Sequence, residues 1–365
     1  MRFHHSKRTD GRPVSAPTVY DVAERAGVSI ATVSRVYRNP DSVREQTRDR
    51  VLEAARGLGY VPSGSARGLA SRTTGVLGLC FPDYSDPDTI GIEDGVEDDD
   101  AAMLSSDRII RGMERAARRH GYALLIAASP EGGPQTLVNQ VAGRVDGFAV
   151  LARTVPTVPT EELEVISRRL PVVMLAGPRE IDHLDHIEVA DADGQRALTR
   201  HLIEDHGLRR LVFVGAAEES PDVEARFAGY AAACRDAGLP VPDAPDVRAP
   251  LMTQAEGARA AEALLDRSGE PPQAMVFADD RMAVGALQSL ERRGLRVPAD
   301  VAVTGFDGIP LSRLVRPTLT TVRRPMRRLG EEAVELLVQR LGDRERTPES
   351  LMLPVTLAKR QSCGC

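Results

Sequence analysis

Tryptophan is absent from this chain of 365 residues, and aromatic residues make up only 4% of it. Nowhere do about 18 apolar residues follow one another, so we expect no membrane-spanning helix. The first 17 residues, MRFHHSKRTDGRPVSAP, lack the apolar segment of a secretory signal. The 4 cysteines are too few for a disulfide scaffold. These absences predict a cytoplasmic protein with reduced thiols and no membrane partner.

Motifs of common enzyme classes are also missing. The sequence contains no G-x-S-x-G, H-E-x-x-H or P-loop pattern, and its 7 histidines are scattered. Cys363 and Cys365 leave metal binding or pairing with another chain open, but two thiols alone do not make a structural metal site. We therefore expect no enzymatic activity, no cofactor and no metal, and we expect residues 359–365 to form a loose tail.

Charge is distributed unevenly along the chain, whose formal net charge is −6. Residues 1–75 carry 13 Lys and Arg against 7 Asp and Glu, whereas residues 76–365 carry 34 against 46. This asymmetry indicates a small module for an anionic partner, joined to a body that does not share that partner. Nucleic acid is the obvious anion, because phosphate contacts dominate non-specific affinity. A solvated basic face is the alternative.

The N-terminal part reads as a small helical domain between two irregular segments. Residues 1–17 have no hydrophobic period and predict a disordered arm. Residues 18–60 predict three short helices, the first over 19–26 and the second over 30–38. Residues 61–74 predict a linker in which a short helix is marginal by itself.

Capping residues define the ends of these three helices. Thr18 and Asp21 have the spacing of a capping box for the first helix, and Ser29 is a typical N-cap for the second. Ser42 and Glu45 have the spacing of another capping box, which opens a third helix running to about Leu58. These signals predict a compact three-helix domain.

The second predicted helix has two distinct faces. Val33, Val36 and Tyr37 form an apolar face suited to a core. The opposite face holds Ile30, Ala31, Ser34, Arg35 and Arg38. In a helix-turn-helix, the second helix enters the major groove of double-stranded DNA with its N-terminal residues at the base edges. An unrelated three-helix bundle is the alternative.

That geometry assigns roles to individual residues. Ile30 and Ala31 are expected to face bases through apolar contact, and Arg35 suits a bidentate contact to guanine. Phosphate or sugar contacts are expected from Tyr20, Thr32 and Ser34. The full set of DNA-binding candidates on these helices is Tyr20, Ser29, Ile30, Ala31, Thr32, Ser34, Arg35 and Arg38.

From Gly75 onward, strand-like and helical segments alternate. The strand-like runs are 75–81, 123–128, 147–151, 172–176, 210–215, 274–278 and 301–306. The helical stretches between them include 107–120, 191–205, 222–237, 254–267, 280–293 and 325–341. Alternation of this kind predicts an α/β fold with parallel sheets covered by helices. About 290 residues exceed a typical single core, so residues 75–358 predict two lobes.

One segment breaks the alternation. Residues 83–107 contain ten acidic residues and no basic residue. Their spacing does not match the D-x-[DN]-x-[DN]-G pattern of a calcium loop. We expect a solvated surface loop there.

The helical domain and linker resemble the DNA-binding headpiece of the LacI/GalR family of repressors. The resemblance rests on TVYDVAERAGVSIATVSRV and on TRDRVLEAARGLGYVPSGSARGLASRTTGVLGL. It implies an all-α headpiece and a linker that becomes a hinge helix on operator DNA, paired with that of a dimer mate. Leu69 matches the family's leucine that wedges into the minor groove, where an apolar side chain unstacks a base step.

The body resembles the two-lobed, periplasmic-binding-protein-like core of the same family. The similar segments include IEVADADGQRALTRHL, VEARFAGYAAA, AMVFADDRMAVGAL and VPADVAVTGFDGIPLSRLVRPTLTTV. The resemblance implies that Arg226, Asp280 and Asp307 line an effector cleft, with Asp83 as a weaker candidate. Carboxylates and a guanidinium suit a polyol ligand. Asp280 as a helix N-cap and Asp307 as a turn residue are the alternatives.

Two departures from the family pattern concern the effector. Ala190-Asp191 stands where the family often has Asp-Asn, and an insertion of roughly 17 residues follows Asp86-Pro87, which is long for a connection. The sequence as a whole predicts a homodimeric transcriptional regulator, a repressor, that binds a pseudo-palindromic operator and responds to a small-molecule effector. A sugar is the expected effector, and a nucleoside-like or acidic metabolite is the alternative. A solute-binding receptor, a sugar-modifying enzyme and a constitutive DNA-binding protein with a non-functional cleft are the rival interpretations.

Overall fold

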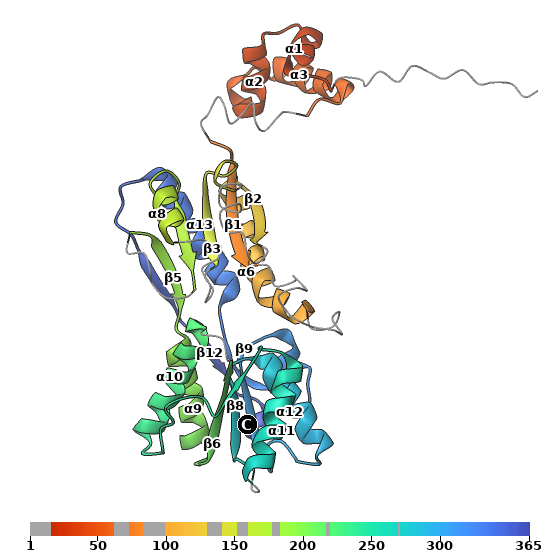
Figure 1. The fold of residues 1–365 in the computed structure, drawn as a ribbon. Coiled ribbons are helices and arrows are strands. Elements are labelled where there is room, and N and C mark those ends of the chain that lie inside the picture. Colours follow the sequence, from red (N-terminus) through yellow and green to blue (C-terminus); the bar gives the residue numbers. More distant parts are fainter. Residues whose placement is uncertain are drawn as a thin grey trace, which may run out of the picture. The chain divides into compact units, whose positions relative to one another are not determined.

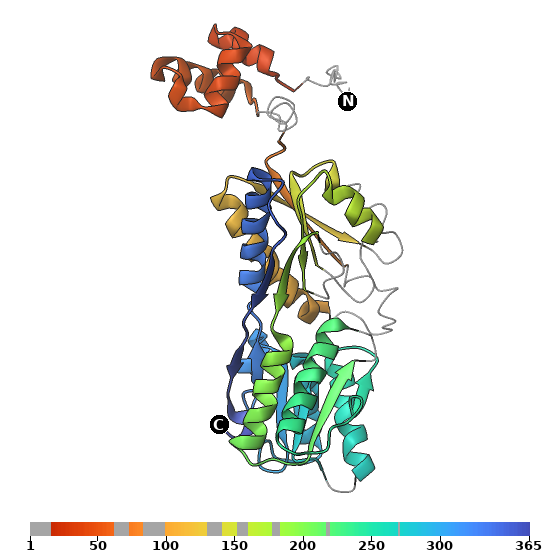
Figure 2. The same cartoon turned by 90° about the vertical axis from the view of Figure 1, so that its left-hand side faces the viewer.

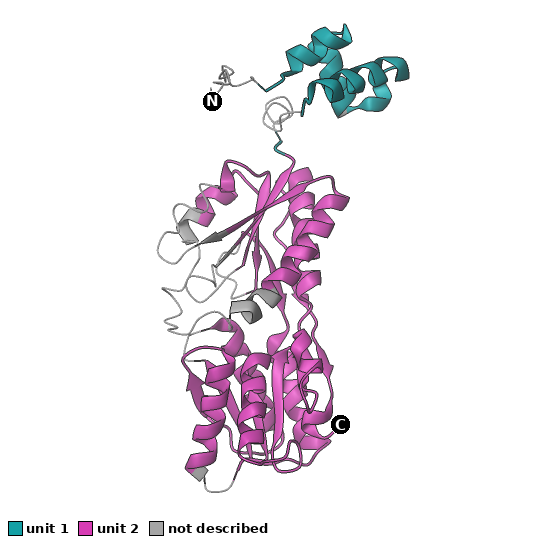
Figure 3. Ribbon diagram, turned by 90° about the vertical axis from the view of Figure 1, so that its right-hand side faces the viewer, with its two compact units in different colours: residues 1–74 teal, residues 75–365 magenta. Residues whose placement is uncertain are grey.

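The computed structural model describes residues 16–61, 73–82, 99–129, 141–151, 160–176, 183–216, 220–268 and 271–365. The chain forms two compact units, residues 1–74 and residues 75–365, coloured separately in Figure 3. The first unit is helical in its described part, and the second combines helices with two sheets (Figure 1).

The described part of the first unit packs three helices around a small apolar core. They are α1 (Val19–Ala26), α2 (Ile30–Arg38) and α3 (Glu45–Leu58), with a 3-10 turn η1 (Pro40–Ser42) before α3. The core side chains include Val22, Val33, Val36, Val51 and Ala55. The first two helices have the predicted bounds, and the predicted capping box of Thr18 and Asp21 is present.

The capping box predicted from Ser42 and Glu45 is wrong. Helix α3 begins at Glu45 itself, with Arg44 at the N-cap and no side chain capping it. Ser42 lies in the 3-10 turn that starts at Pro40, where its Oγ donates to the carbonyl oxygen of Asn39 at 2.7 Å. The Ser42 hydroxyl therefore bonds a local backbone acceptor and does not cap α3.

The second unit contains two sheets of six strands each among its described residues. The first sheet has the order β11-β5-β4-β3-β1-β2 and is entirely parallel. Its strands are β1 (Val76–Pro82), β2 (Ala123–Ser129), β3 (Gly147–Leu151), β4 (Val172–Leu175), β5 (Asp185–Val189) and β11 (Ser350–Leu353). The described helices of this first lobe include α6 (Asp99–Arg119), α8 (Thr160–Ser167) and α13 (Met326–Gly342).

The second sheet has the order β12-β10-β9-β8-β6-β7 and is parallel except for β12. Its strands are β6 (Leu211–Ala216), β7 (Val247–Ala249), β8 (Ala274–Phe277), β9 (Ala302–Asp307), β10 (Thr320–Arg323) and β12 (Thr356–Ala358). Helices α9 (Asp191–Glu204), α10 (Pro221–Asp236), α11 (Gln254–Ser268) and α12 (Asp280–Arg292) belong to this second lobe, with the 3-10 turns η3 (Pro310–Arg313) and η4 (Gln361–Cys363).

Each sheet is buried on both faces, as parallel sheets require. In the first lobe, α6 and α13 cover one face and α8 lies on the other (Figure 2). Strand β1 accordingly alternates, since Leu77 and Leu79 belong to one core and Cys80 to the other. In the second lobe, α11 and α12 cover one face, and α9 and α10 cover the other.

Counted over the described elements, the chain passes between the lobes three times. It does so from β5 into α9, from β10 into α13 and from β11 into β12. All seven predicted strands and all six predicted helices are present. Strands β5, β7, β10, β11 and β12 and helix α8 were not predicted.

Two sequence-based expectations for this unit are wrong. The acidic segment predicted as a loop over 83–107 is helical from Asp99, where α6 begins, and residues 83–98 lie outside the described residues. Acidic residues favour a helix N-terminus, where they offset the positive end of the helix dipole.

The second error concerns residues 359–365, which are not a loose tail. Residues Gln361–Cys363 form η4, and Ser362 and Cys363 are buried. The Oγ atom of Ser362 donates to the carbonyl oxygen of Val303 at 2.6 Å and accepts from the amide of Thr320 at 2.8 Å. The C-terminus is therefore part of the second lobe.

Candidate functional site

Helix α2 presents a solvent-exposed face at its N-terminal end. Ile30 is 39% exposed although it is a large aliphatic residue, and Ala31 and Arg35 are exposed beside it. Tyr20 on α1 is 67% exposed. Exposed apolar side chains next to a basic residue suit contact with base edges, which offer thymine methyl groups and guanine acceptors.

Two of the polar DNA-binding candidates, Ser29 and Thr32, bond to each other at the start of α2. The Oγ atom of Ser29 accepts from the amide of Thr32 at 3.2 Å and lies 2.9 Å from its hydroxyl, so both residues build the start of α2. Ser34 is half-buried, and Arg38 is the last residue of α2. Leu69 lies outside the described residues.

A buried cluster of charges lies at the carboxyl ends of the second lobe's strands, where open parallel sheets bind ligands. Its centre is Arg226 on α10, which is 3% exposed. Nε and Nη2 of Arg226 donate to Asp191 Oδ2 at 3.2 and 3.1 Å, and Nη2 also donates to Asp307 Oδ1 at 3.1 Å. Nη1 donates to the carbonyl oxygen of Ala278, immediately after β8, at 2.6 Å.

A second guanidinium joins the cluster at a crossing between the lobes. Arg324 follows β10, and its Nη2 donates to Asp222 Oδ2 at 2.8 Å. Its Nε lies 3.1 Å from Asp191 Oδ1, which is ion-pair distance without hydrogen-bond alignment. Asp191 is the first residue of α9, at the crossing from β5, and Arg324 lies at the crossing from β10 into α13. Two of the crossings between the lobes therefore contribute a residue to this network.

The backbone around the cluster is unusually constrained. Asp307 has a φ of 100°, which is uncommon for a residue other than glycine. Such conformations concentrate at ligand sites, where the surrounding structure enforces them. Helices α9 and α10 also approach closely, since a Cβ at Gly229 would overlap the carbonyl oxygen of Ala192. This contact holds Arg226 of α10 beside Asp191 of α9.

The acidic neighbours of Arg226 keep its buried guanidinium charged. Burial disfavours the charged form of Arg226, yet Asp307 and Asp191 raise its pKa overall. The side chains of Asp222 and Asp307 retain 31% and 15% of their exposure, whereas Asp191 retains 2%. The accessible carboxylate oxygens suit acceptance of hydrogen bonds from a polar ligand.

The other two effector candidates are placed differently. Asp280 is fully buried, and its Oδ2 accepts from the amide of Ile309 at 2.8 Å. The alternative of Asp280 as an N-cap is wrong, because Asp279 caps α12 by accepting from the amides of Arg281 and Met282. Asp280 thus supports the backbone that follows Asp307. Asp83 lies outside the described residues.

Sequence reasoning missed three members of the cluster, namely Asp191, Asp222 and Arg324. Asp191 was noted only as a departure from a family pattern, and its position at a helix start after a strand was the available signal. Arg324 comes from TVRRP, at the end of an unpredicted strand. Asp222 lies 102 residues from Arg324, its partner, so no local pattern connects the two.

Two family models match the chain. The model described as "Bacterial regulatory proteins, lacI family" matches residues 18–63, and the "Periplasmic binding protein-like domain" matches residues 199–363. Among curated relatives, catabolite control protein A of Priestia megaterium is 33% identical over 94% of this chain and 98% of that protein.

Two solved structures are similar to this chain over nearly its whole length. A lac repressor dimer bound to operator and the anti-inducer ONPF is 26% identical, covers 96% of this chain and 99% of its own, and has a TM-score of 0.79. A complex of the transcriptional regulator CelR with cellobiose is 28% identical over 95% of this chain and 99% of its own, with a TM-score of 0.68.

Proposed function

This chain belongs to the LacI family of bacterial regulatory proteins, and we propose that it is a homodimeric repressor whose affinity for a pseudo-palindromic operator is set by a sugar-like effector. It is a DNA-binding transcriptional regulator, as the family is. The operator, the dimer and the effector are the proposed parts, and we place the protein in the cytoplasm. Among the described residues, no helix combines the length and apolarity needed to cross a membrane.

The exposed face of α2 is the observation that supports operator recognition. Ile30, Ala31 and Arg35 are free to meet base edges, while the buried Val33 and Val36 hold the helix on its domain. One such helix reads one half-site. A two-fold symmetric dimer then reads an inverted pair of half-sites about one helical turn, or a multiple of it, apart. The operator-bound dimer of the lac repressor supports this arrangement by analogy. Leu69 remains our candidate for the minor-groove wedge.

The charged cluster supports the proposal for the effector. We assign ligand contact to Arg226 and Asp307, together with the partly exposed Asp222. Hydroxyl groups of a sugar donate to carboxylates and accept from guanidinium groups. The cellobiose complex of CelR supports a saccharide ligand by analogy. The two lobes can adopt two arrangements that differ in DNA affinity. A ligand that binds one arrangement more tightly shifts the protein toward it, and the change in DNA affinity is limited by the ratio of its affinities for the two arrangements.

Selection of genomic fragments by the purified chain tests the DNA part. The selection is run at a stated salt concentration, with and without a mixture of mono- and disaccharides. We expect a shared pseudo-palindrome among the retained fragments, and a change in retention when an effector is present. Sequence-independent binding that only salt weakens would contradict operator recognition.

Three rival functions make different predictions. A constitutive DNA-binding protein retains the operator equally with every saccharide. An enzyme consumes its saccharide, whereas a regulator returns it unchanged, so chromatography of the recovered ligand distinguishes them. A solute-binding receptor binds the saccharide but selects no operator. Our proposal requires operator selection, ligand response and recovery of intact ligand together.

A further inference from the structure

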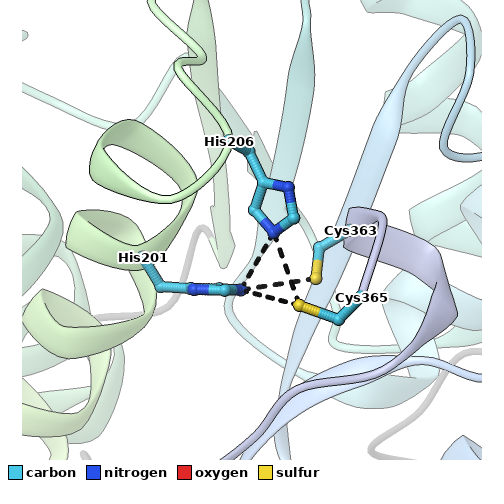
Figure 4. A group of neighbouring side chains, drawn as sticks. All are labelled: His201, His206, Cys363 and Cys365. Carbon is cyan, nitrogen blue, oxygen red and sulfur yellow. Dashed lines mark hydrogen bonds between the residues drawn. The ribbon is translucent and has the colours of Figure 1, made fainter.

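Four metal-binding side chains converge at the C-terminus of the second lobe, away from the regulatory residues described above. His201 lies in the last turn of α9 and His206 follows that helix, while Cys363 ends η4 and Cys365 ends the chain. Their ligand atoms all lie within 4.8 Å of one another. Figure 4 shows the two imidazoles and the two thiols pointing toward a common centre.

Four of the six separations between these atoms match the edges of a metal tetrahedron, and the other two are within 4.8 Å. Zn²⁺ at the centre, with bonds of about 2.0–2.1 Å to nitrogen and about 2.3 Å to sulfur, separates two nitrogens by about 3.3 Å and nitrogen from sulfur by about 3.6 Å. His201 Nε2 lies 3.2 Å from His206 Nε2. It lies 3.5 Å from Sγ of both Cys363 and Cys365, and His206 Nε2 lies 3.5 Å from Cys365 Sγ.

The surroundings of His201 prepare its Nε2 for a metal. Its Nδ1 lies 2.6 Å from Oδ2 of Asp205, and this carboxylate also accepts from Nζ of Lys359 at 2.8 Å. A hydrogen bond from Nδ1 to a carboxylate fixes the tautomer whose Nε2 carries a lone pair. A carboxylate behind a histidine ligand is the usual outer partner of protein zinc sites.

The protein backbone holds the cysteines in place independently of these contacts. Ser362, which precedes Cys363, is buried, and its hydroxyl is bonded to the backbone of Val303 and Thr320. Cys363 and His201 are 3% and 5% exposed, while Cys365 is exposed and His206 is half-buried. The site is therefore preformed and still open to an entering ion.

We propose that His201, His206, Cys363 and Cys365 form a structural Zn²⁺ site that ties the C-terminus to the end of α9. Four protein ligands leave no open position, which distinguishes a structural zinc site from a catalytic one. Two thiolates and two imidazoles select Zn²⁺ over hard cations such as Mg²⁺ and Ca²⁺. The proposal is independent of effector and operator recognition.

Metal binding by the reduced full-length chain tests the site. The chain is stripped with a chelator and titrated with Co²⁺ or Zn²⁺. We expect one ion per chain, and for Co²⁺ the intense visible bands of a tetrahedral complex with thiolate-to-metal charge transfer. Zn²⁺ should displace Co²⁺ and abolish these bands. A reduced chain that binds neither ion stoichiometrically overturns the proposal.

Single substitutions distinguish zinc binding at this site from zinc binding by other cysteines. Cys365→Ser changes the exposed last residue, and we expect it to lower zinc affinity by more than about 100-fold, beyond the 10–100-fold typical of outer partners. His206→Gln should do the same, and Asp205→Asn should cost about 10–100-fold with one ion still bound. Cys234→Ala, in the apolar core, is the matched control and should bind as the parent does.

Two outcomes contradict the proposal. The first is Zn²⁺ affinity that is unchanged in both Cys365→Ser and His206→Gln. The second is a Cys363–Cys365 disulfide in protein isolated without added oxidant, detected by mass spectrometry. If His206→Gln fails to fold, Cys365→Ser decides, because its side chain contributes no buried packing.

Discussion

Arg226 shows how one side chain can join several parts of a lobe. Its guanidinium reaches the start of α9, the end of β9 and the end of β8 through Asp191, Asp307 and Ala278. It also lies over the ring of Phe306, 4.2 Å from the centroid. Only a planar, multidentate cation makes all these contacts together, so lysine is not an equivalent replacement.

The first prediction concerns Arg226→Lys. The variant keeps the positive charge beside Asp191 but loses most of the hydrogen bonds, so we expect a folded protein with normal operator affinity and an effector response at least about 10-fold weaker. Operator binding by fluorescence anisotropy, across a saccharide titration, measures both. Arg196→Lys is the control, because Arg196 pairs with Asp236 in an exposed bridge. An undiminished response in Arg226→Lys would remove Arg226 from the effector site.

Asp280 gives a prediction about pH. Burial raises its pKa well above the ordinary value, so the folded protein disfavours the ionised carboxylate. Stability from this group is therefore present at low pH and decreases as pH rises from the unfolded pKa, about 3.9, through the higher folded pKa. The limiting slope for one group is about 1.4 kcal/mol per pH unit.

Asp280→Asn removes this ionisation while keeping an oxygen acceptor for the amide of Ile309. We expect the unfolding free energy of the parent, relative to the variant, to fall as pH rises above about 4. Urea denaturation of both proteins at several pH values measures the difference. A difference that is constant across the range would mean that Asp280 does not titrate abnormally.

At the scale of elements, α2 is the helix to which our proposal assigns the reading of DNA bases. Arg35 is exposed, so Arg35→Ala should leave the domain folded. We expect operator affinity to fall by about 1–3 kcal/mol, the discrimination of one bidentate base contact, with little change in affinity for random DNA. Arg56→Ala, an exposed arginine in the last turn of α3, is the charge-matched control. Binding to both DNAs is measured over a salt series.

The salt series distinguishes a base contact from a phosphate contact. Loss of one phosphate contact reduces the slope of log affinity against log salt by about 0.9 and weakens both DNAs alike. Equal losses for operator and random DNA in Arg35→Ala would therefore assign Arg35 to the backbone and leave base reading to other side chains of α2.

Local signals explain which elements the sequence predicted well. Helices α1 and α2 were predicted to the residue, because Thr18, Ser29 and Gly27 mark their ends by local hydrogen bonds and a left-handed glycine. Strand β5 was missed because DHIEV carries polar residues, and the buried Asp185 is paired with Arg340 and accepts from the amide of Glu349. That pairing spans 155 residues, and a local pattern does not contain it.

The candidate sites were also predicted only where a local sequence signal existed. The family resemblance supplied Arg226 and Asp307, but their partners Asp191 and Arg324 come together only in the folded lobe. The thiols of Cys363 and Cys365 looked insufficient because His201 lies more than 150 residues earlier in the sequence. Contacts of this range depend on the packing of α9 against the second sheet, which periodicity alone does not specify.

For the second unit as a whole, the crossings define how the lobes can communicate. Asp191 and Arg324 stand at two of the three crossings, and Arg226, Asp222 and Asp307 bind them from the second lobe. A ligand that competes for these carboxylates changes the contacts of both crossings at once. If the effector binds this cluster, as we propose, the cluster couples the bound effector to the relation between the lobes.

Coupling of this kind is reciprocal, which provides the last prediction. If an effector changes operator affinity by a given factor, the operator must change effector affinity by the same factor, typically 5–150-fold. We will take the saccharide that alters operator binding most and measure its affinity by calorimetry, with and without saturating operator duplex. Equal factors in the two directions support one linked equilibrium. In Arg226→Lys both factors should shrink together. Unequal factors would require a second saccharide site, and factors of one in both directions would favour a constitutive DNA-binding protein.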